Sequence, residues 1–175
     1  IAKQNLEQGL VELVYDNGQH AANGLLISNE GHFLTARHCV ERDNLPRYLR
    51  LHDGKICSIE KVLVKGKGNL DIALAEANII TDFNPNYVSY NVQSGERYPV
   101  ASYTRWNGLM DVKYGITEQI LLENITFFNS QINLREGDSG GIVVSAHKEL
   151  LGINVELCFS KLEGRAVNFS KALEL

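Results

Sequence analysis

The stretch REGDSGGIVV, residues Arg135 to Val144, places Ser139 among small residues. Gly, Asp and Ser are frequent in surface turns, so the stretch alone fits a simple turn. A serine hydroxyl becomes a nucleophile only when a neighbouring base takes its proton and a carboxylate orients that base. The rest of the chain must therefore supply a histidine and an acid before Ser139 becomes a candidate catalytic residue.

Short strand-like runs lie on both sides of this stretch. Each is apolar or alternating, and Asn, Gly or Asp punctuates the gaps. We predict strands at residues 10–15, 24–28, 32–36, 47–51, 56–64 and 71–76, and at 97–103, 110–114, 118–128, 141–145, 150–157 and 165–169. Only SKALEL, residues 170–175, is predicted as a helix, with Ser170 as its cap. Regularly spaced short strands indicate an all-β barrel or sandwich.

The composition is that of an ordinary globular protein. The 175 residues are 22% charged and 44% hydrophobic, and the net charge is -4. A nucleic-acid-binding domain would show a basic excess, so we predict no nucleic-acid partner. No apolar run reaches about 20 residues, and we predict no membrane span. The first residue is Ile1 rather than Met, which we interpret as a processed end or a cloning boundary.

The three cysteines, Cys39, Cys57 and Cys158, lack C-x-x-C spacing. They give no signal for a zinc site or a dithiol redox centre. His32 and His38 are six residues apart, but no acid or thiol cluster lies beside them in the sequence. We therefore predict buried thiols, no metal and no cofactor.

One of the five histidines, His38, has the setting of a base. It closes the run GHFLTARHCV, where a predicted strand gives way to a turn. Asp71 of NLDIALAE has a similar setting, at the mouth of an otherwise apolar strand. Catalytic groups tend to lie on loops and strand ends that a rigid scaffold carries. The candidate residues thus follow the order His38, Asp71, Ser139.

These motifs resemble those of the trypsin-like serine proteases. LTARHCV is similar to the histidine motif of that family, DIALAE to its aspartate motif, and GDSGG matches its nucleophile motif at every position. NGLLISNEGHFLTARHCV, SGERYPVASY, QINLREGDSGGIVV and ELLGINVEL look more like the bacterial Deg/HtrA and glutamyl-endopeptidase types than like the digestive enzymes. The resemblance covers most of residues 23–169.

The resemblance implies a fold of two six-stranded antiparallel β-barrels, with the active site between them and a short C-terminal helix. It implies an N-terminal barrel over residues 1–78 that carries the histidine and the aspartate. A linker over residues 79–90 would lead to a C-terminal barrel over residues 91–175. That second barrel would carry the serine and the specificity pocket.

The resemblance also implies a role for each candidate residue. His38 would be the general base for Ser139, and Asp71 would orient His38 and stabilise its charged form. The backbone N–H groups of Gly137 and Ser139 would form the oxyanion hole. The implied activity is that of a serine endopeptidase, which hydrolyses protein or peptide substrates through an acyl-enzyme.

A different reading of the same serine is the G-x-S-x-G nucleophile elbow of the α/β-hydrolases. In that fold the acid and then the histidine follow the serine along the chain. Only 36 residues follow Ser139; they contain no Asp, and His147 is their single histidine. The predicted strands also lack the intervening helices that cover a parallel sheet. Both observations argue against this fold.

Asp138 raises the question of activation by cleavage. In the digestive branch the equivalent aspartate pairs with the α-amino group of an N-terminal Ile, whereas the Deg/HtrA pattern has Asn there. This chain has both Ile1 and Asp138, so pairing between them in a cleaved zymogen is a hypothesis. The opening IAKQ differs from the usual IVGG, which leaves a plain cloning boundary as the alternative.

The preference for the residue before the cut stays open. By family position, the pocket candidates are Asn133, Leu134, Arg135, Val155, Glu156, Leu157 and Glu163. A buried Glu156 or Glu163 would favour Arg or Lys, whereas Arg135 would favour acidic residues. A slip of one position in a strand reverses which side chains point inward, so neither preference is selected.

Two other functions remain as alternatives to the endopeptidase. One is a protease-like binding or chaperone module with little turnover, and the other is a structural barrel. Most relatives are exported, so we expect a secreted or periplasmic protein; the unpaired cysteines also fit a cytosolic protein or one delivered into a host cell. The sequence does not indicate an oligomeric state.

Overall fold

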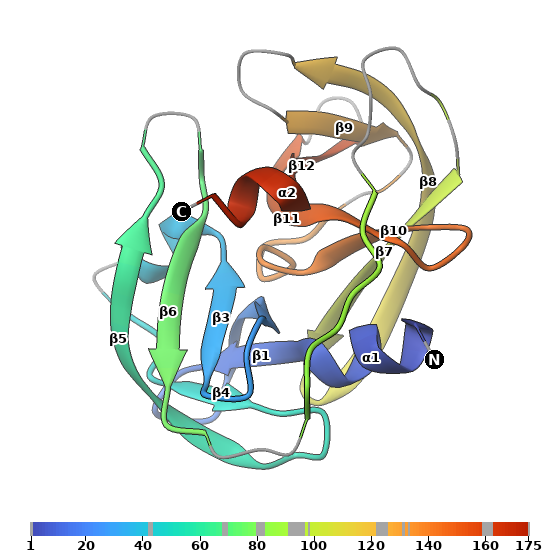
Figure 1. Ribbon diagram of the computed structural model, residues 1–175. Helices are drawn as coiled ribbons and strands as arrows, with labels where there is room; N and C mark the ends of the chain where they lie inside the picture. The colour runs from blue at the N-terminus through green and yellow to red at the C-terminus, as the bar shows by residue number, and fades with distance from the viewer. Residues whose placement is uncertain are drawn as a thin grey trace.

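The computed structural model describes residues 2–41, 44–67, 70–79, 83–90, 97, 99–121, 126–130, 132, 134–158 and 163–174. Strands dominate these ranges, and strands from the first and second halves of the chain gather in two separate groups (Figure 1). No helix in the described ranges combines the length and the apolar character of a membrane span.

The first group of strands forms a closed barrel. Its members are β1 (Leu10–Val14), β2 (His20–Leu26), β3 (His32–Thr35), β4 (Tyr48–Arg50), β5 (Ile56–Lys65) and β6 (Ala73–Ala77). All neighbours pair antiparallel in the order β1-β2-β3-β6-β5-β4, and β4 closes the ring by pairing with β1. We call this unit the N-terminal barrel.

The strand pairings also close the second group into a ring, in the order β10-β11-β12-β9-β8-β7. Its members are β7 (Pro99–Trp106), β8 (Leu109–Leu121), β9 (Thr126–Ser130), β10 (Ile142–Ser145), β11 (Leu150–Cys158) and β12 (Glu163–Asn168). We call this unit the C-terminal barrel. The predicted all-β class of trypsin-like architecture is confirmed.

A continuous apolar core holds the two groups together. Leu13, Leu25 and Phe33 of the N-terminal barrel are fully buried, and they share one cluster with Ile142 and Ile153 of the C-terminal barrel. A smaller second cluster lies within the C-terminal half and consists of Val100, Ile132, Leu134, Val143, Leu151 and Ala166. Strand β6 shows the expected alternation, because its alanines are buried while Leu74 and Glu76 are half-buried.

The structure differs from the sequence prediction in the bounds of several elements. Residues 118–128 were predicted as one strand, but β8 ends at Leu121 and β9 begins at Thr126. Strand β2 begins at His20, four residues before the predicted start, because residues of the segment 20–23 pair with β1 although His20 and Asn23 are polar. A short 3-10 helix, η1 (Arg37–Val40), stands where a turn was predicted, and the C-terminal helix α2 is Phe169–Ala172.

Helix α1 (Ala2–Gly9) was not predicted at all. Its sequence is mostly polar, and an isolated helix of this length is marginal in water, so local propensity does not reveal it. Tertiary contacts stabilise it instead. Leu6 is buried, and the buried Arg105 of β7 donates to the carbonyl oxygens of Glu7 at 2.6 Å and Leu10 at 2.8 Å.

The predicted linker, residues 79–90, packs against both barrels where the structure describes it. Ile79 is buried in the common core. The Tyr87 hydroxyl donates to the carbonyl oxygen of Leu26 at 2.6 Å, and its ring meets Phe169 edge-on at 6.3 Å. Ser89 forms an isolated bridge with Leu150 at the start of β11. The connection is therefore a packed segment rather than a free tether.

The contact between Arg105 and α1 generates a prediction about stability. Replacing Arg105 with Met removes the hydrogen bonds to the carbonyl oxygens of Glu7 in α1 and Leu10 at the start of β1, so the free energy of unfolding should fall by about 1–3 kcal/mol. Urea unfolding measures this change. The control is Arg47→Met, because the Arg47 side chain is 72% exposed and its contact with Asp16 is long, at 3.8 Å. The Arg47→Met substitution should change the free energy of unfolding by less than about 0.5 kcal/mol. Equal losses in the two variants would contradict the role of Arg105.

Candidate active site

His38 and Asp71 approach each other at one end of the N-terminal barrel. His38 lies in η1, directly after β3, and Asp71 lies just before β6, the strand that pairs with β3. The His38 imidazole Nδ1 is 2.7 Å from Asp71 Oδ2, and the His38 backbone N–H donates to Asp71 Oδ1 at 2.9 Å. Both carboxylate oxygens therefore orient the same histidine.

Ser139 reaches this pair from the loop before β10. Its hydroxyl oxygen is 3.1 Å from His38 Nε2 and 3.4 Å from the carbonyl oxygen of Val155 on β11. The N–H of Asn23 on β2 donates to the Ser139 carbonyl oxygen at 2.8 Å. The structure thus brings together His38, Asp71 and Ser139, which are far apart in the sequence.

The electrostatic environment favours a charged His38. The hydrogen bond to Asp71 raises the pKa of His38 well above its ordinary value; the neighbouring Cys39 adds to the rise, and burial opposes it. The His38 side chain is 41% exposed, so it remains accessible from solvent. This arrangement can stabilise an imidazolium next to a serine oxygen.

Backbone donors lie beside Ser139. Among the residues that the structure describes, the N–H groups of Gly137 and Ser139 donate to no backbone carbonyl, whereas those of Asp138 and Gly140 do. Gly137 has a φ of 100°, a conformation that favours glycine. A Cβ there would lie 2.6 Å from the Trp106 ring. The position therefore requires glycine both for its backbone conformation and for space.

Asp138 is fully buried and pairs with an internal cation. Its Oδ2 accepts from Lys113 Nζ of β8 at 3.1 Å and from the backbone N–H of Arg135 at 2.8 Å. The Arg135 guanidinium is 3.6 Å from the other carboxylate oxygen. Ile1 lies outside the described residues, so its pairing with Asp138 stays a prediction.

The predicted pocket residues are only partly described. Leu134 and Val155 are buried, and Val155 lies next to Ser139 through its carbonyl oxygen. The Arg135 side chain is 48% exposed; its guanidinium lies over the Trp106 ring at 4.4 Å and 3.4 Å from Asp111. Arg135 therefore already has partners other than a substrate.

The other four pocket candidates lie outside the described side chains. Asn133 lies outside the described residues. Glu156 and Leu157 are part of β11 and Glu163 begins β12, but their side chains lie outside the description.

Cys39 and Cys57 are buried and free, and the side chain of Cys158 lies outside the description. In the ranges that the structure describes, no three His, Cys, Asp or Glu side chains are grouped as metal ligands would be.

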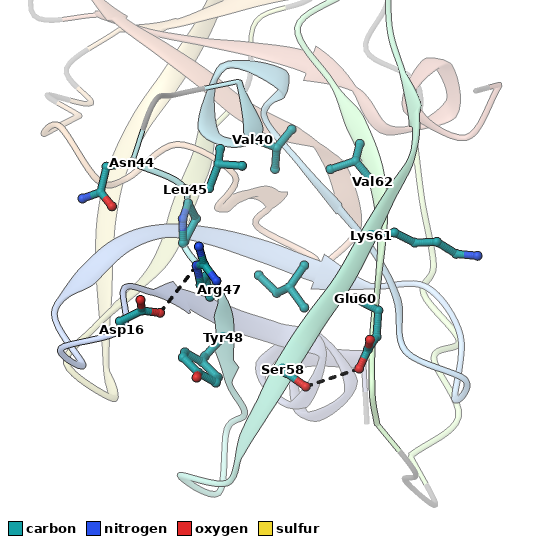
Figure 2. A pocket seen from close by; sticks show the side chains of 12 residues that line it. Asp16, Val40, Asn44, Leu45, Arg47, Tyr48, Ser58, Glu60, Lys61 and Val62 are labelled. Carbon is teal, nitrogen blue, oxygen red and sulfur yellow. Dashed lines mark hydrogen bonds and ion pairs between the residues drawn. The ribbon is translucent and has the colours of Figure 1, made fainter.

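A separate cleft of about 540 Å³ lies on the N-terminal barrel, between residues 44–48 and β5 (Figure 2). Leu45, Arg47, Ser58 and Ile59 are among its lining residues, and Arg47 reaches toward Asp16 across one end. None of the predicted site residues lines this cleft. The candidate active site is therefore a different feature of the surface.

Comparison with known proteins gives the family. A family model described as a trypsin-like peptidase domain matches residues 22–153, a range that includes His38, Asp71 and Ser139. The chain belongs to the trypsin-like peptidase family. As a member it is a serine peptidase, which acts on protein or peptide substrates. The resemblance inferred from the three sequence motifs is thereby confirmed.

Solved structures show the same fold for this peptidase domain. The MamO protease domain from Magnetospirillum magneticum aligns with a TM-score of 0.75 at 19% identity, over 98% of this chain and 97% of that chain. A serine endoprotease from Yersinia pestis aligns with a TM-score of 0.74 at 21% identity, over 99% of this chain and 63% of that chain. No curated protein sequence matches significantly.

Sequence reasoning missed a group of buried polar residues behind the site of the peptidase domain. Glu12, His20 and Asn23 come from β1 and β2, and each forms a hydrogen bond to the C-terminal half of the chain. The available signal was a glutamate in the centre of the apolar run LVELV. A charged residue at such a position is buried only when it is paired.

The pairing of Asp138 generates a second stability prediction. Lys113→Met and Asp138→Asn should each destabilise the domain, and a double-mutant cycle should give a coupling free energy of about 1–3 kcal/mol. Urea unfolding of the four proteins supplies the numbers. The matched cycle is Lys61→Met with Glu76→Gln, a surface pair 4.0 Å apart in which the Lys61 side chain is 64% exposed, and we expect a coupling of less than about 0.5 kcal/mol. Additive effects of Lys113→Met and Asp138→Asn would rule out the coupling.

Proposed function

We propose that this trypsin-like peptidase domain is a serine endopeptidase that cleaves peptide bonds through an acyl-enzyme on Ser139. His38 acts as the general base, and Asp71 holds it in the required tautomer. The observation that carries the proposal is the continuous hydrogen-bonded chain from Asp71 Oδ2 to His38 at 2.7 Å and from His38 Nε2 to the Ser139 hydroxyl oxygen at 3.1 Å.

The proposed reaction has two halves. The Ser139 oxygen attacks the substrate carbonyl carbon while His38 Nε2 takes the hydroxyl proton. The tetrahedral intermediate then collapses, the carbon–nitrogen bond breaks, and His38 returns the proton to the leaving amine. Water repeats the sequence on the acyl-enzyme, with His38 again as base, and releases the acid product and free Ser139.

Charge that develops on the substrate oxygen would be stabilised by the N–H groups of Gly137 and Ser139. In this proposal the loop orients both donors before the reaction, because preorganised donors stabilise the transition state more than the ground state. Asp71 stays ionised and stabilises the imidazolium of His38 in both halves of the reaction.

We also propose the division of the chain that the sequence indicates. The N-terminal unit, residues 1–78, contributes His38 and Asp71, and the C-terminal unit, residues 91–175, contributes Ser139 and the oxyanion donors. Residues 79–90 connect the two. In this arrangement the reaction depends on contact between both units, because neither contains all the required groups.

A fluorophosphonate probe tests the nucleophile. The wild-type protein should become labelled and should hydrolyse fluorescent casein, whereas Ser139→Ala should do neither. The matched control is Ser58→Ala, because Ser58 is bonded only to Glu60 among the described side chains and should leave labelling unchanged. If the Ser139→Ala protein becomes labelled as the wild-type protein does, that result would contradict the proposal. A wild-type protein that is neither labelled nor active would favour a binding or chaperone module.

The hydrogen bond between Asp71 and His38 generates a prediction about pH. Because this bond raises the pKa of His38, the imidazole stays protonated and unable to act as a base until the pH exceeds the ordinary histidine value. The rate should therefore rise with pH along a limb that lies above about 6.5.

Asp71→Asn provides the matching variant. We expect its rate near neutral pH to fall by about 10⁴-fold, because the amide no longer fixes the productive tautomer, and its residual limb to move to lower pH. Both effects are measured by the initial rates of peptide hydrolysis between pH 5 and pH 10, determined about every half pH unit. If the rising limb of the pH–rate profile lies at the same pH in the Asp71→Asn protein, the proposed effect of Asp71 on the pKa of His38 is wrong.

A further inference from the structure

A second histidine–carboxylate pair lies behind the candidate active site and takes no part in the proposed proton transfers. Glu12 occupies the centre of β1 and His20 begins β2, on neighbouring antiparallel strands. The His20 Nδ1 is 2.7 Å from Glu12 Oε2, and the two side chains are only 2% and 0% exposed. Such a buried charged pair requires compensation from its surroundings.

The other edge of the His20 ring faces the loop that carries Ser139. His20 Nε2 is 2.7 Å from the carbonyl oxygen of Gly137, and Asn23 Nδ2 donates to the same oxygen at 3.0 Å. The ring also stacks on Trp106 with a centroid distance of 4.0 Å. His20 thus connects the buried carboxylate of the N-terminal barrel with a residue of the proposed oxyanion hole.

Glu12 is held in its ionised form. Burial by itself raises the pKa of Glu12, but the hydrogen bond to His20 opposes that effect. The backbone N–H groups of Asn107 and Gly108 donate to it at 2.8 Å and 2.9 Å, and together these bonds lower its pKa to about 2. Arg50 completes the group with a contact of 3.0 Å to Oε1.

The partners of His20 determine its protonation. Nδ1 faces a carboxylate and Nε2 faces a backbone carbonyl, and both of these groups can only accept hydrogen bonds. A neutral imidazole donates through one nitrogen, so the second contact would set two lone pairs against each other. From the two short contacts at 2.7 Å we infer that both ring nitrogens of His20 carry a proton. The Trp106 ring against which it stacks favours a cation as well.

An anchor on the Gly137 carbonyl restricts the oxyanion donor of the same residue. Glycine rotates more freely than any other residue, so its N–H is poorly fixed unless neighbouring atoms hold it. Here a charge-assisted bond from His20 and a neutral bond from Asn23 hold the carbonyl oxygen, and Trp106 and the His20 ring occupy the space where a Cβ would lie.

We propose that His20, paired with Glu12, is a positioning residue that holds the Gly137 backbone in the orientation required for its N–H to stabilise the oxyanion. The inference rests on the proposed function of Ser139. His20 contacts neither the substrate nor the reacting atoms; it acts through Gly137. The chemical form that does this is the imidazolium, whose second proton bonds to the Gly137 carbonyl.

The test compares acylation rates of folded variants. 4-Nitrophenyl acetate is an activated ester that needs no side-chain pocket, so its burst phase measures acylation of Ser139 directly. His20→Phe keeps an aromatic ring against Trp106 but donates no hydrogen bond, and it should slow acylation by about 10–100-fold with little change in ester binding. His20→Gln restores a neutral donor toward Gly137 and should recover part of this loss.

A matched control separates positioning from general loss of structure. His32 is a half-buried histidine of the same barrel, and its Nδ1 is 2.7 Å from Ser28 Oγ in the turn between β2 and β3. His32→Gln should acylate at the wild-type rate. Urea unfolding of each variant gives its stability. A structural role alone would make the acylation rate follow stability, whereas positioning predicts slow acylation by variants that remain folded.

Nitrogen-15 NMR provides a readout that does not depend on activity. Spectra of the Ser139→Ala protein and of the Ser139→Ala, His20→Gln double variant are compared, and the signals missing from the double variant are assigned to His20. These signals should show that both ring nitrogens of His20 are protonated. A neutral His20 ring would overturn the inference. Acylation at the wild-type rate by folded His20→Phe protein would overturn it as well. If the His20→Phe variant does not fold, acylation at the wild-type rate by His20→Gln protein is the outcome that would overturn it. If the wild-type protein shows no burst phase with 4-nitrophenyl acetate, that result counts against the proposed function of Ser139. The NMR spectra would then decide only whether the His20 ring is doubly protonated.

Discussion

Asn23 fixes the position of the serine loop relative to the N-terminal barrel. Its backbone N–H donates to the Ser139 carbonyl oxygen at 2.8 Å, and its side-chain amide donates to the Gly137 carbonyl oxygen at 3.0 Å. Its side-chain oxygen accepts from the N–H of Arg105 at 2.6 Å, and its carbonyl oxygen accepts from Thr35. Each polar group of this buried residue is satisfied, and most of the bonds cross between the barrels. The contact of 3.1 Å between His38 and Ser139 depends on this alignment.

The two histidine–carboxylate pairs differ in burial, and that difference separates their chemistry. His38 is partly exposed and faces a hydroxyl group, which can both donate and accept, so it can lose and regain a proton. The His20 side chain is buried between two acceptors, and in our proposal it donates to both of them. In the two proposals, a histidine–carboxylate pair thus provides a proton carrier at one position and a fixed cation at the other.

The sequence alone located the groups that lie in compact motifs. GDSGG, the histidine run and the aspartate run each occupy a few adjacent residues, and the strands between them show period-two patterns that predict an all-β fold. The helix α1 and the Glu12–His20 pair could not be found this way. The first depends on donors from Arg105 on a distant strand, and the second depends on strand pairing that brings β1, β2 and the 137–140 loop together. The glutamate in LVELV indicates a buried charge that needs a partner, but the sequence does not show which residue that partner is.

The distribution of reactive groups between the barrels also bears on how the chain can be divided. His38 and Asp71 precede residues 83–90, and Ser139 with its backbone donors follows them. Two fragments separated in that segment would each keep a full set of six strands while carrying complementary halves of the chemistry. The apolar cluster that the two barrels share is the surface through which such fragments would have to associate before all three side chains could meet.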